Sequence, residues 1–326
     1  MLDENCKKKP CWACKGHNVI GWGKQIGKQR FKCKDCGILF TRNNPGVTES
    51  NRFKWFKDWI IGRQTLLQIS KSSGYSERSL NRYFAEYLSK PPVLSVRPSE
   101  KVNLLIDGTY FRNDLCLIIY RDNNIKFTQL YRLTSGERYE EIREDLANLL
   151  KLGVQIESIT CDGHRALLKA VKKECKHVIV QRCLVHIQRM CRIWLSSRPK
   201  STAGYELKKI VGVLHKIKNQ DDWGYWIVSL INWYREYESF INEKSYNSLT
   251  GRYWYKHKMI RRSFTTIKRA LPNMFHYLQN DRIPKTTNGL ESFFGHLKSH
   301  LVVHRGLSKQ HRKSFITWYL YLKNCV

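Results

Sequence analysis

Acidic residues are scarce in this sequence. Its 326 residues include 27 Asp and Glu against 58 Lys and Arg, which gives a formal charge of +31 at pH 7. A charge of this size calls for a polyanionic partner, either a membrane surface or a nucleic acid. Long apolar runs are also missing: no stretch approaches the roughly 18 to 20 residues of a membrane-spanning helix, and residues 1–9 do not resemble a signal peptide. These absences favour a nucleic acid as the partner and predict a cytoplasmic protein.

Cysteine is plentiful, but its pattern argues against a disulfide scaffold. Such scaffolds are typical of short secreted chains, whereas these eleven cysteines, an odd number, lie in a long chain. Four of them form two Cys-x-x-Cys pairs with 18 residues, 15–32, between the pairs: Cys11, Cys14, Cys33 and Cys36. This spacing is typical of four-cysteine sites in which a zinc ion replaces a hydrophobic core. We expect one structural Zn²⁺; Cys6 and His17 are spare ligands, and unrelated free thiols are the competing interpretation.

A helical segment with one sharp turn follows the cysteine pairs. Apolar positions recur there at helical spacing, and Gly74 and Ser76 interrupt the pattern. A helix, a glycine-containing turn and a second helix capped by Ser76 form the pattern of a helix-turn-helix, whose second helix fits the DNA major groove. Ser79, Asn81 and Arg82 are expected to face outward on that helix and to donate hydrogen bonds to bases or phosphates. An ordinary helical hairpin is the alternative.

From residue 102 the pattern changes to that of an α/β domain. Three apolar segments separated by short turns predict an antiparallel meander, which a helix, a strand, a second helix and a fifth strand follow. The segments are Val102–Ile106, Leu115–Tyr120 and Phe127–Leu133 for the meander, then 139–153, Ile156–Cys161, Ala166–Cys175 and Val178–Val180. This order is that of an RNase H-like mixed sheet with helices packed on its faces.

No strand pattern survives between Ile187 and Pro284, which predicts an all-helical block. Tryptophan and tyrosine recur along this basic stretch, and core packing is their more common use. Trp254 is the best candidate for an exception, a side chain that stacks on unpaired bases. A further helix is expected to begin near Gly289.

Three acids far apart in the sequence are placed to meet at the rim of the predicted sheet. Asp107 and Asp162 each follow an apolar strand, and Glu291 lies in the first turn of the helix near Gly289. Phosphodiester chemistry with two metal ions about 3.5 to 4 Å apart needs such hard oxygen ligands. Each acid also has a purely structural interpretation. The two Asp-Gly dipeptides are common strand-ending turns, and Glu291 has the spacing of a capping box with Asn288.

Together these features resemble the mutator-like DDE transposases of bacterial insertion sequences, in a variant with a zinc-binding N-terminus. The resemblance covers nearly the whole chain. Besides the cysteine pairs it rests on Ile106-Asp107-Gly-Thr-Tyr, Thr160-Cys-Asp162-Gly-His, Arg182-Cys183-Leu-Val-His186 and Asn288-Gly-Leu-Glu291-Ser-Phe-Phe-Gly-His-Leu-Lys298. The order of the Asp motifs together with Cys183-x-x-His186 makes it specific.

The resemblance implies a DNA transposase with an RNase H-like (retroviral integrase-like) core and an all-helical insertion between the second Asp and the Glu. It implies that Asp107, Asp162 and Glu291 hold two Mg²⁺ or Mn²⁺ ions for direct attack on DNA, first by water and then by a 3′-hydroxyl. Cys183 and His186 resemble a signature that supports the site structurally; half of a metal site with Cys175 or His177 is the alternative.

The predicted organisation has six parts. They are a zinc ribbon, 1–45; a helix-turn-helix, 50–90; an extended proline-containing linker, 91–100; the first part of the core, 101–186; the helical insertion, 187–285; and the C-terminal helices of the core with the third acid, 286–326. The zinc ribbon and helix-turn-helix are expected to bind terminal inverted repeats in double-stranded DNA, as a homodimer or larger, nucleoid-associated assembly. A nuclease or resolvase that cuts without joining, and a catalytically inactive DNA-binding regulator, are the alternatives.

Overall fold

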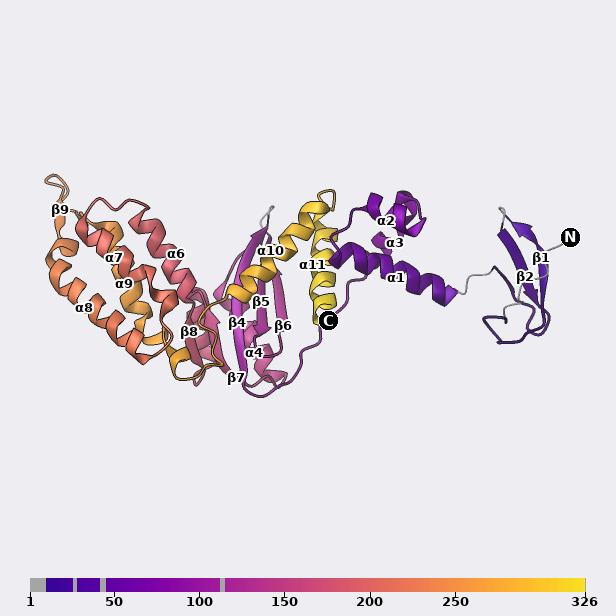
Figure 1. Cartoon of the computed structure of the whole chain (residues 1–326), viewed down its shortest axis with the longest axis horizontal. Helices are drawn as coiled ribbons and strands as arrows, with labels where there is room; N and C mark the ends of the chain where they lie inside the picture. Colours follow the sequence, from indigo (N-terminus) through magenta and orange to yellow (C-terminus); the bar gives the residue numbers. More distant parts are fainter. Residues whose placement is uncertain (1–9, 26–27, 42–44, 112–114, 326) are drawn as a thin grey trace. The chain divides into compact units, whose positions relative to one another are not determined.

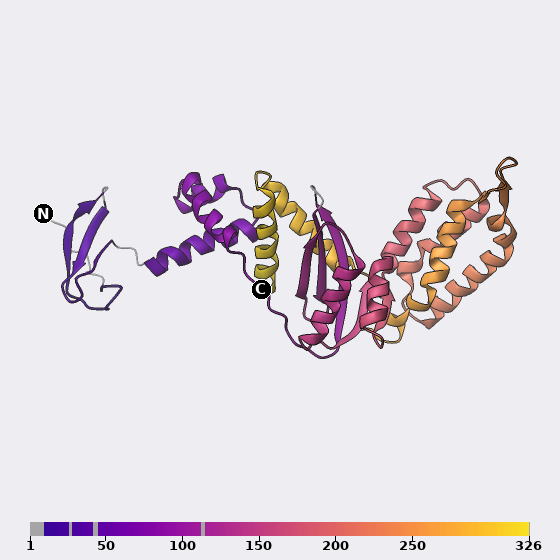
Figure 2. The same ribbon diagram turned by 180° about the vertical axis from the view of Figure 1, so that it is seen from behind.

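The computed structural model describes residues 10–25, 28–41, 45–111 and 115–325 (Figures 1 and 2). The spare zinc ligand Cys6 lies outside these ranges. The chain forms two compact units: the described residues up to Pro91 together with His300–Lys323, and Pro92–Ser299 with the last residues. In the described part of the chain, no helix has both the length and the apolar character needed to cross a membrane.

The first unit begins with a small antiparallel sheet in the order β1-β2-β3. Its strands are Val19–Gln25, Lys28–Cys33 and Leu39–Thr41. The buried core consists of Val19 and two cysteines, with Phe31 and Phe40 packed against it. A core of this size is too small to hold the sheet together, which is why the cysteine cluster described below matters.

Three helices follow: α1 (Pro45–Ile61), α2 (Leu66–Ser73) and α3 (Glu77–Ser89). Gly74 ends α2 in the left-handed conformation with φ 73°, and its N–H donates to the Ser70 carbonyl. The hydroxyl of Ser76 caps α3 by accepting from the backbone N–H of Ser79. The glycine turn and the serine cap predicted from the sequence are therefore confirmed.

The last helix, α11 (Lys309–Asn324), packs against α1 and α3. Phe56 lies at the centre of this contact, 5.2 Å from the Trp318 ring, and the indole N–H of Trp318 donates to the Tyr87 carbonyl over 2.9 Å. We expected 286–326 to belong wholly to the catalytic core; the structure assigns His300–Lys323 to the first unit.

The second unit contains a five-stranded mixed sheet in the order β6-β5-β4-β7-β8. Its strands are β4 (Val102–Phe111), β5 (Leu115–Asp122), β6 (Phe127–Thr134), β7 (Ile156–Cys161) and β8 (Ile179–Arg182). The first three pair antiparallel, and β7 and β8 join them in parallel. The predicted succession of three strands, helix, strand, helix, strand is confirmed.

Helices cover both faces of this sheet (Figures 1 and 2). α4 (Tyr139–Lys151) and α5 (Arg165–Glu174) share one apolar core with the sheet. On the other face α10 (Asn288–Val303) runs along β4 and β5, where the guanidinium of Arg121 lies 4.8 Å from the Phe293 ring. The predicted helix near Gly289 is therefore present.

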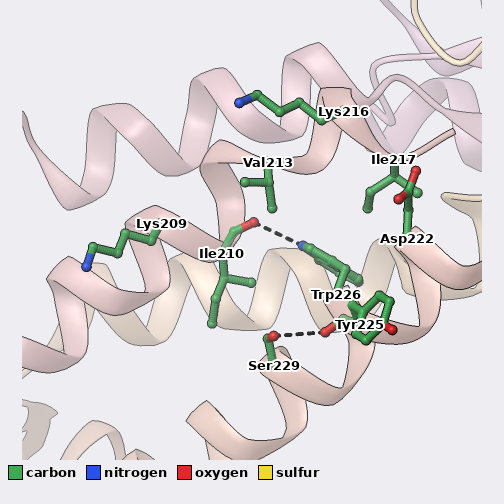
Figure 3. A pocket seen from close by; sticks show the side chains of 9 residues that line it. All are labelled: Lys209, Ile210, Val213, Lys216, Ile217, Asp222, Tyr225, Trp226 and Ser229. Carbon is green, nitrogen blue, oxygen red and sulfur yellow. Dashed lines mark hydrogen bonds between the residues drawn. The ribbon is translucent and has the colours of Figure 1, made fainter.

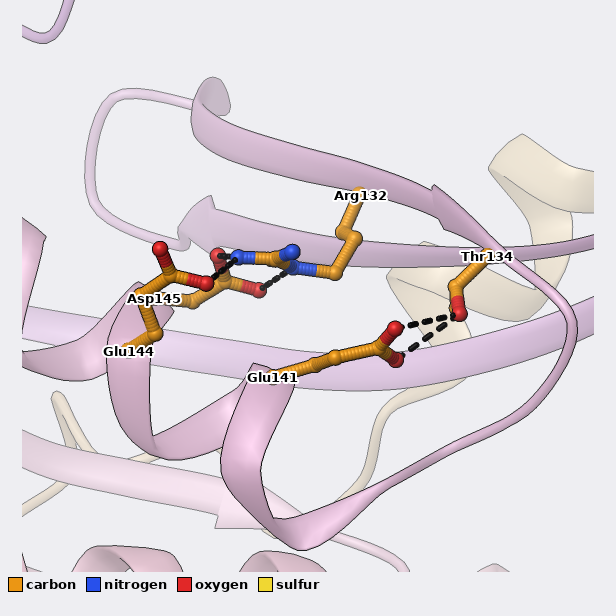
Figure 4. Close-up of polar contacts among 5 residues, drawn as sticks. All are labelled: Arg132, Thr134, Glu141, Glu144 and Asp145. Atoms are coloured by element: carbon orange, nitrogen blue, oxygen red, sulfur yellow. Dashed lines mark hydrogen bonds and ion pairs between the residues drawn. The ribbon is translucent and has the colours of Figure 1, made fainter.

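A buried ion pair ties α4 to β6 (Figure 4). The guanidinium of Arg132 donates to both oxygens of Asp145, over 2.6 and 2.8 Å, and the Asp145 side chain is only 4% exposed. The Thr134 hydroxyl donates to Glu141 one helical turn away. A bidentate pair compensates for the loss of water around a buried carboxylate, so these contacts fix the helix on the edge strand.

Between β8 and α10 lies the predicted helical insertion. Its elements are α6 (Leu184–Leu195), α7 (Thr202–Gly212), η1 (Leu214–Lys216), α8 (Gln220–Asn242), α9 (Lys258–Ala270), η2 (Leu271–Asn273) and η3 (His276–Leu278). Trp226 and Trp233 are buried in its core. The prediction that this block is all-helical is wrong in one place, because β9 (Lys244–Tyr246) and β10 (Tyr253–Tyr255) form an antiparallel hairpin. These strands have no buried face and therefore no apolar alternation that a sequence pattern can reveal.

The packing of His304 predicts that acid weakens the docking of α11. Its ring lies 4.5 Å from Trp59 and 5.2 Å from Phe315, and burial lowers the pKa of His304 to about 4. An unfolded histidine titrates near pH 6.5, so the stability due to the neutral ring is complete above that pH and is lost as the pH falls toward 4. At pH 5 we expect a loss of about 2 kcal/mol.

Hydrogen exchange of α11 at pH 7 and pH 5, corrected for the intrinsic rates, measures this loss. His304→Phe is the matched control, because it keeps an aromatic ring that cannot be protonated. An equal pH dependence in the variant and the wild type would contradict the role given to His304.

Candidate metal centres

Strand pairing brings the two aspartates side by side. Ile106 is the partner of Cys161 in the parallel pairing of β4 with β7, so the next residues, Asp107 and Asp162, are neighbours across a gap of about 4.8 Å. Side chains alternate along a strand. Because Ile106 points into the core beneath α4 and α5, Asp107 points to the opposite face, which α10 covers.

We expected Asp107 to end its strand, but it does not. β4 continues to Phe111, and Asp107 pairs with Ile119 of β5. The interpretation of Asp107-Gly108 as a strand-ending turn is therefore wrong. The antiparallel partner β5 extends the strand past the acid, which holds the carboxylate on a rigid element.

α10 brings the third acid to the same place. Its second residue, Gly289, packs on β4, since a Cβ at this position would lie 3.9 Å from the Leu105 Cδ1 atom. Glu291, half a turn further along, is close to Asp107 and to His186 of α6. One ligand atom from each of these three side chains lies within 4.8 Å of the other two.

Asp162 lies beside this group but is not one of its three members. Its Oδ1 atom accepts from the backbone N–H of His164 over 2.8 Å, which orients the carboxylate. Partial burial raises the pKa of Asp107 to about 6; the positive charge of His186 opposes this rise, and the negative charge of Asp162 adds to it. The two aspartates are thus within electrostatic reach of each other.

The environment of Glu291 suits a cation. Its Oε2 atom accepts from the guanidinium of Arg189 over 2.8 Å, whereas its Oε1 atom is buried and has no hydrogen-bond partner. The Nε2 atom of His186 lies 3.5 Å from this Oε1 atom. A capping box with Asn288 would instead turn this carboxylate toward its own helix. Two oxygen ligands of one Mg²⁺, each about 2.1 Å from it, lie at most about 4.2 Å apart. Small side-chain movements would therefore seat an ion between Glu291 and Asp107.

Cys183 holds the end of the insertion against the sheet. Its backbone N–H donates to the Cys161 carbonyl over 2.7 Å, and its thiol accepts from the backbone N–H and the hydroxyl of Thr287 over 3.3 and 3.4 Å. The Thr287 hydroxyl also lies 3.4 Å from the Nδ1 atom of His186. These contacts favour structural support for Cys183. In the described part of the chain, no metal-ligand cluster joins it to Cys175 or His177.

His186 faces the acids as a cation. Burial lowers the pKa of its imidazole, but the Cys183 thiol and the carboxylates of Asp107 and Asp162 together outweigh burial and raise this pKa to about 9. The imidazolium therefore offsets part of the negative charge at this rim of the sheet.

Two charged side chains at this rim were not predicted from the sequence. One is Glu137, whose Oε1 atom would clash with a Cβ at Gly108, so the carboxyl rests against the backbone next to Asp107. Its Oε2 atom is 3.6 Å from the Nδ1 atom of His164. Glu137 precedes α4 in a loop with no recognisable motif. The other is Arg189, which follows His186 by three residues, a spacing that does indicate a shared helix face.

The four cysteines of the N-terminal module form a second cluster. The Sγ atoms of Cys11 and Cys36 are 3.7 Å apart, those of Cys14 and Cys33 are 3.5 Å apart, and all four lie within 4.8 Å of one another. Four sulfur atoms about 2.3 Å from a tetrahedral Zn²⁺ lie about 3.8 Å apart, whereas a disulfide needs about 2.05 Å. The arrangement fits one zinc ion and not a pair of disulfides.

The two cysteine turns have the same backbone geometry. In each, the residue four positions after the first cysteine donates its N–H to that cysteine's carbonyl, Lys15 to Cys11 and Gly37 to Cys33, and both donors have positive φ, 61° and 74°. The matching turns present their thiols to one point from opposite sides of the module.

The residues proposed to contact DNA differ in exposure. On α3, Asn81 and Arg82 are exposed, whereas Ser79 is half-buried and its hydroxyl bonds to that of Ser76. Trp254 on β10 is 53% exposed, unlike the buried tryptophans of the insertion core.

Two of the concave surfaces on the insertion differ in their chemistry. A cavity of about 380 Å³ opens between α7, η1 and α8 (Figure 3), where the Trp226 indole N–H donates to the Ile210 carbonyl and the Ser229 hydroxyl to the Tyr225 carbonyl. Both of these donors are thus bonded within the protein, and none of the predicted acids lines the cavity. A groove of about 500 Å³ follows α6 and includes Arg189. It is lined by Val185, Gln188, Arg189, Arg192, Ile193, Ser196, Ser197 and Lys208. This groove is basic, and one of its lining residues, Arg189, bonds to Glu291.

A comparison with models of protein families identifies a match. The family model described as "Transposase, Mutator family" matches residues 130–306, which is more than half of the chain. The matched range includes Asp162, His186 and Glu291 and begins after Asp107. The search of curated proteins found no match.

The zinc cluster predicts that the purified protein carries about one Zn²⁺ per chain. Cys14→Ser should release this ion and unfold the β1-β2-β3 sheet, because the remaining core is too small to hold it. Metal analysis and limited proteolysis measure both effects, with Cys325→Ser, a change at an exposed cysteine outside the cluster, as the control. Full zinc content in Cys14→Ser would show that the ligand set is wrong.

The raised pKa of Asp107 predicts that the ionised carboxylate, the form that binds a metal ion, lowers the stability of the metal-free protein. Because the folded pKa of about 6 exceeds the ordinary value of 3.8, the ionised carboxylate destabilises the metal-free protein above pH 6, and this cost disappears as the pH falls toward 3.8. Asp107→Asn should therefore stabilise the metal-free protein at pH 7.5, by on the order of 1 to 3 kcal/mol.

Thermal melting in EDTA and in Mn²⁺ measures this prediction. Mn²⁺ should raise the melting temperature of the wild type and of Glu140→Gln, an exposed acid on α4, but not that of Asp107→Asn. If Mn²⁺ stabilised Asp107→Asn as much as the wild type, Asp107 would not be a ligand.

Proposed function

The chain belongs to the Mutator family of transposases, and on that premise we propose that it binds terminal inverted repeats and cuts and joins DNA strands with two divalent metal ions. Asp107, Asp162 and Glu291 are the proposed ligands of these ions. The five-stranded mixed sheet that holds them is proposed to be an RNase H-like core, interrupted by the insertion at 187–285. In this proposal a zinc ribbon, 1–45, and a helix-turn-helix, 50–90, precede the core.

One observation carries the proposal: acids from β4 and α10, far apart in the sequence, approach each other beside a third acid at the end of β7. Carboxylates repel one another, so a folded protein gathers them at a partly buried rim when cations lie between them. The buried Oε1 atom of Glu291, with no hydrogen-bond partner, is the atom that an ion would satisfy.

Hard carboxylate oxygens suit Mg²⁺ and Mn²⁺. When bound, two such ions would activate the attacking oxygen and stabilise the leaving oxygen of a phosphodiester. The protein's own contribution is to hold the ligands. Arg189 orients Glu291, the N–H of His164 orients Asp162, and the rigid pairing of β4 with β5 fixes Asp107. In the proposed reaction water and then a 3′-hydroxyl attack DNA directly, so no protein nucleophile is required.

Arg189 has a second proposed role. Its guanidinium stands where the basic groove along α6 meets Glu291, and Arg192 and Lys208 continue the positive charge along that groove. Arginine and lysine neutralise DNA phosphates. The groove is thus the proposed path of the strand whose phosphate reaches the acids.

Recognition of the element ends is assigned to other parts of the chain. α3 has the length and the exposed Asn81 and Arg82 of a helix that reads the major groove, with Ser79 at its capped start. The zinc module would add phosphate contacts, and Trp254 would stack on an unpaired base. Two ends must be brought together for transposition, so the active species is proposed to be a homodimer or a larger assembly on DNA.

The direct test uses the purified protein, DNA carrying the ends of its own element, a target plasmid and Mg²⁺ or Mn²⁺. Asp162→Asn and Glu291→Gln should each lower cleavage and joining at least about 100-fold, because metal ligation contributes several kcal/mol to the transition state. Both variants should still bind the ends in a gel-shift assay, and Glu140→Gln should behave as the wild type.

The products separate the alternatives. Joined strands establish a transposase reaction, whereas cutting without joining by the wild type indicates a nuclease or resolvase. Binding without either reaction indicates an inactive regulator. Wild-type rates in Glu291→Gln would reject the proposed ligand set.

A further inference from the structure

The hairpin of the insertion exposes apolar and aromatic side chains in one small area. Leu249, in the turn between β9 and β10, is 93% exposed, and Tyr246, Tyr253 and Trp254 on the strands are each more than half exposed. A single exposed leucine is ordinary on a protein surface, but four large apolar side chains on one short ribbon indicate a contact surface.

The turn is ordered although its leucine faces solvent. The Oδ1 atom of Asn247 accepts from the backbone N–H groups of Leu249 and Thr250, over 2.9 and 3.0 Å. The N–H of Gly251 donates to the Asn247 carbonyl, and the N–H of Asn247 donates to the Arg252 carbonyl. Four hydrogen bonds therefore fix the tip with Leu249 at its end.

The two faces of the ribbon differ. Tyr246 and Tyr253 are direct partners on one face, and their rings are 6.0 Å apart. The ammonium of Lys244 lies over the Tyr253 ring at 4.2 Å, so cations and aromatic rings alternate there. On the other face Trp254 stands opposite Ser245, a small residue that leaves the indole uncovered.

The charge around the hairpin selects the partner. Residues 243–262 include six cations: Lys244, Arg252, Lys256, Lys258, Arg261 and Arg262. Their one acid, Glu243, accepts from Lys256 over 2.5 Å and lies 3.1 Å from the His257 imidazole. A surface that combines exposed rings with an excess of cations fits a nucleic acid, which offers phosphates and stacked bases together.

We propose that the β9–β10 hairpin is a wedge that distorts transposon-end DNA, with Leu249 inserted between two base pairs. The inference rests on the proposed function only in taking element-end DNA as the partner. Leucine has no side-chain donor or acceptor with which to hydrogen-bond to base edges. Proteins instead insert such apolar side chains between base steps, which unstacks the bases and kinks the duplex. The cations flanking the tip hold the phosphates on either side. Trp254 then lies one residue pair from the loop, where it stacks on a base released from the duplex.

The first experiment maps DNA distortion without any cleavage. Permanganate oxidation of unstacked thymines is measured on element-end DNA bound to the full-length protein in EDTA. The wild type should make one base step reactive, and Leu249→Ala should lower that reactivity about 10-fold or more while binding the DNA. Val228→Ala removes another exposed apolar side chain of the insertion, on α8, and should leave the reactivity unchanged. No reactive step in the wild type, or undiminished reactivity in Leu249→Ala, overturns the wedge.

The second experiment asks whether opening the DNA in advance replaces the leucine. On fully paired ends, Leu249→Ala should cut about 10- to 100-fold more slowly than the wild type, since unstacking is unfavourable. On ends with a mismatch at the mapped step, the variant should recover to within about threefold of the wild type. A merely structural defect would not be repaired by a change in the DNA, so failure of the mismatch to restore cutting contradicts the proposal.

The two proposals fail separately. Distortion in EDTA by a wild type that cuts no DNA rejects the proposed catalysis and supports the wedge. Normal cutting by Leu249→Ala on paired ends rejects the wedge and leaves the catalysis intact.

Discussion

The carboxylates of the proposed site repel one another, and the structure around them depends on offsetting this repulsion. Asp107, Asp162 and Glu291 gather at one rim of the sheet, where partial burial strengthens their mutual repulsion. His186 and Arg189 of α6 offset that charge from one side. The first turns of α6 therefore serve as a counter-charge that keeps the acids together in the metal-free protein. The same helix continues into the basic groove, so counter-charge and proposed DNA path are parts of one element.

The long insertion separates Asp162 from Glu291 in the sequence, and the two acids can meet only if both ends of the insertion are fixed. Three hydrogen bonds fix these ends. The Leu184 N–H donates to the Lys285 carbonyl, the Thr160 hydroxyl to the Pro284 carbonyl, and the Thr287 hydroxyl to the Cys183 thiol. The first and last residues of the insertion thus lie together beside β7 and β8. The position of Glu291 near the aspartates is therefore set by these ends and not by the helices between them. These contacts give Cys183 a structural role at the base of the insertion.

The sequence predicts those parts of the molecule that leave a periodic or spaced pattern. Buried strands carry apolar runs, so the succession of strands and helices along the chain was predictable, and four cysteines at fixed spacing predicted their cluster. Glu137 was not predictable, because only the fold brings a loop residue against Gly108. The extension of β4 beyond Asp107 depends on pairing with β5, and the hairpin at Trp254 has no buried face to mark it. Long-range pairing and exposed structure are what local patterns do not contain.

The most direct measurement of the central claim is the anomalous scattering of Mn²⁺ in crystals of the full-length protein. The account predicts two peaks about 3.5 to 4 Å apart, each about 2.1 to 2.2 Å from carboxylate oxygens of Asp107, Asp162 and Glu291. It also predicts that His186 shifts away from the Oε1 atom of Glu291, while Arg189 stays bonded to the Oε2 atom. Crystals soaked in Mn²⁺ that show no peak at this rim, with His186 still facing the Oε1 atom of Glu291, would contradict it.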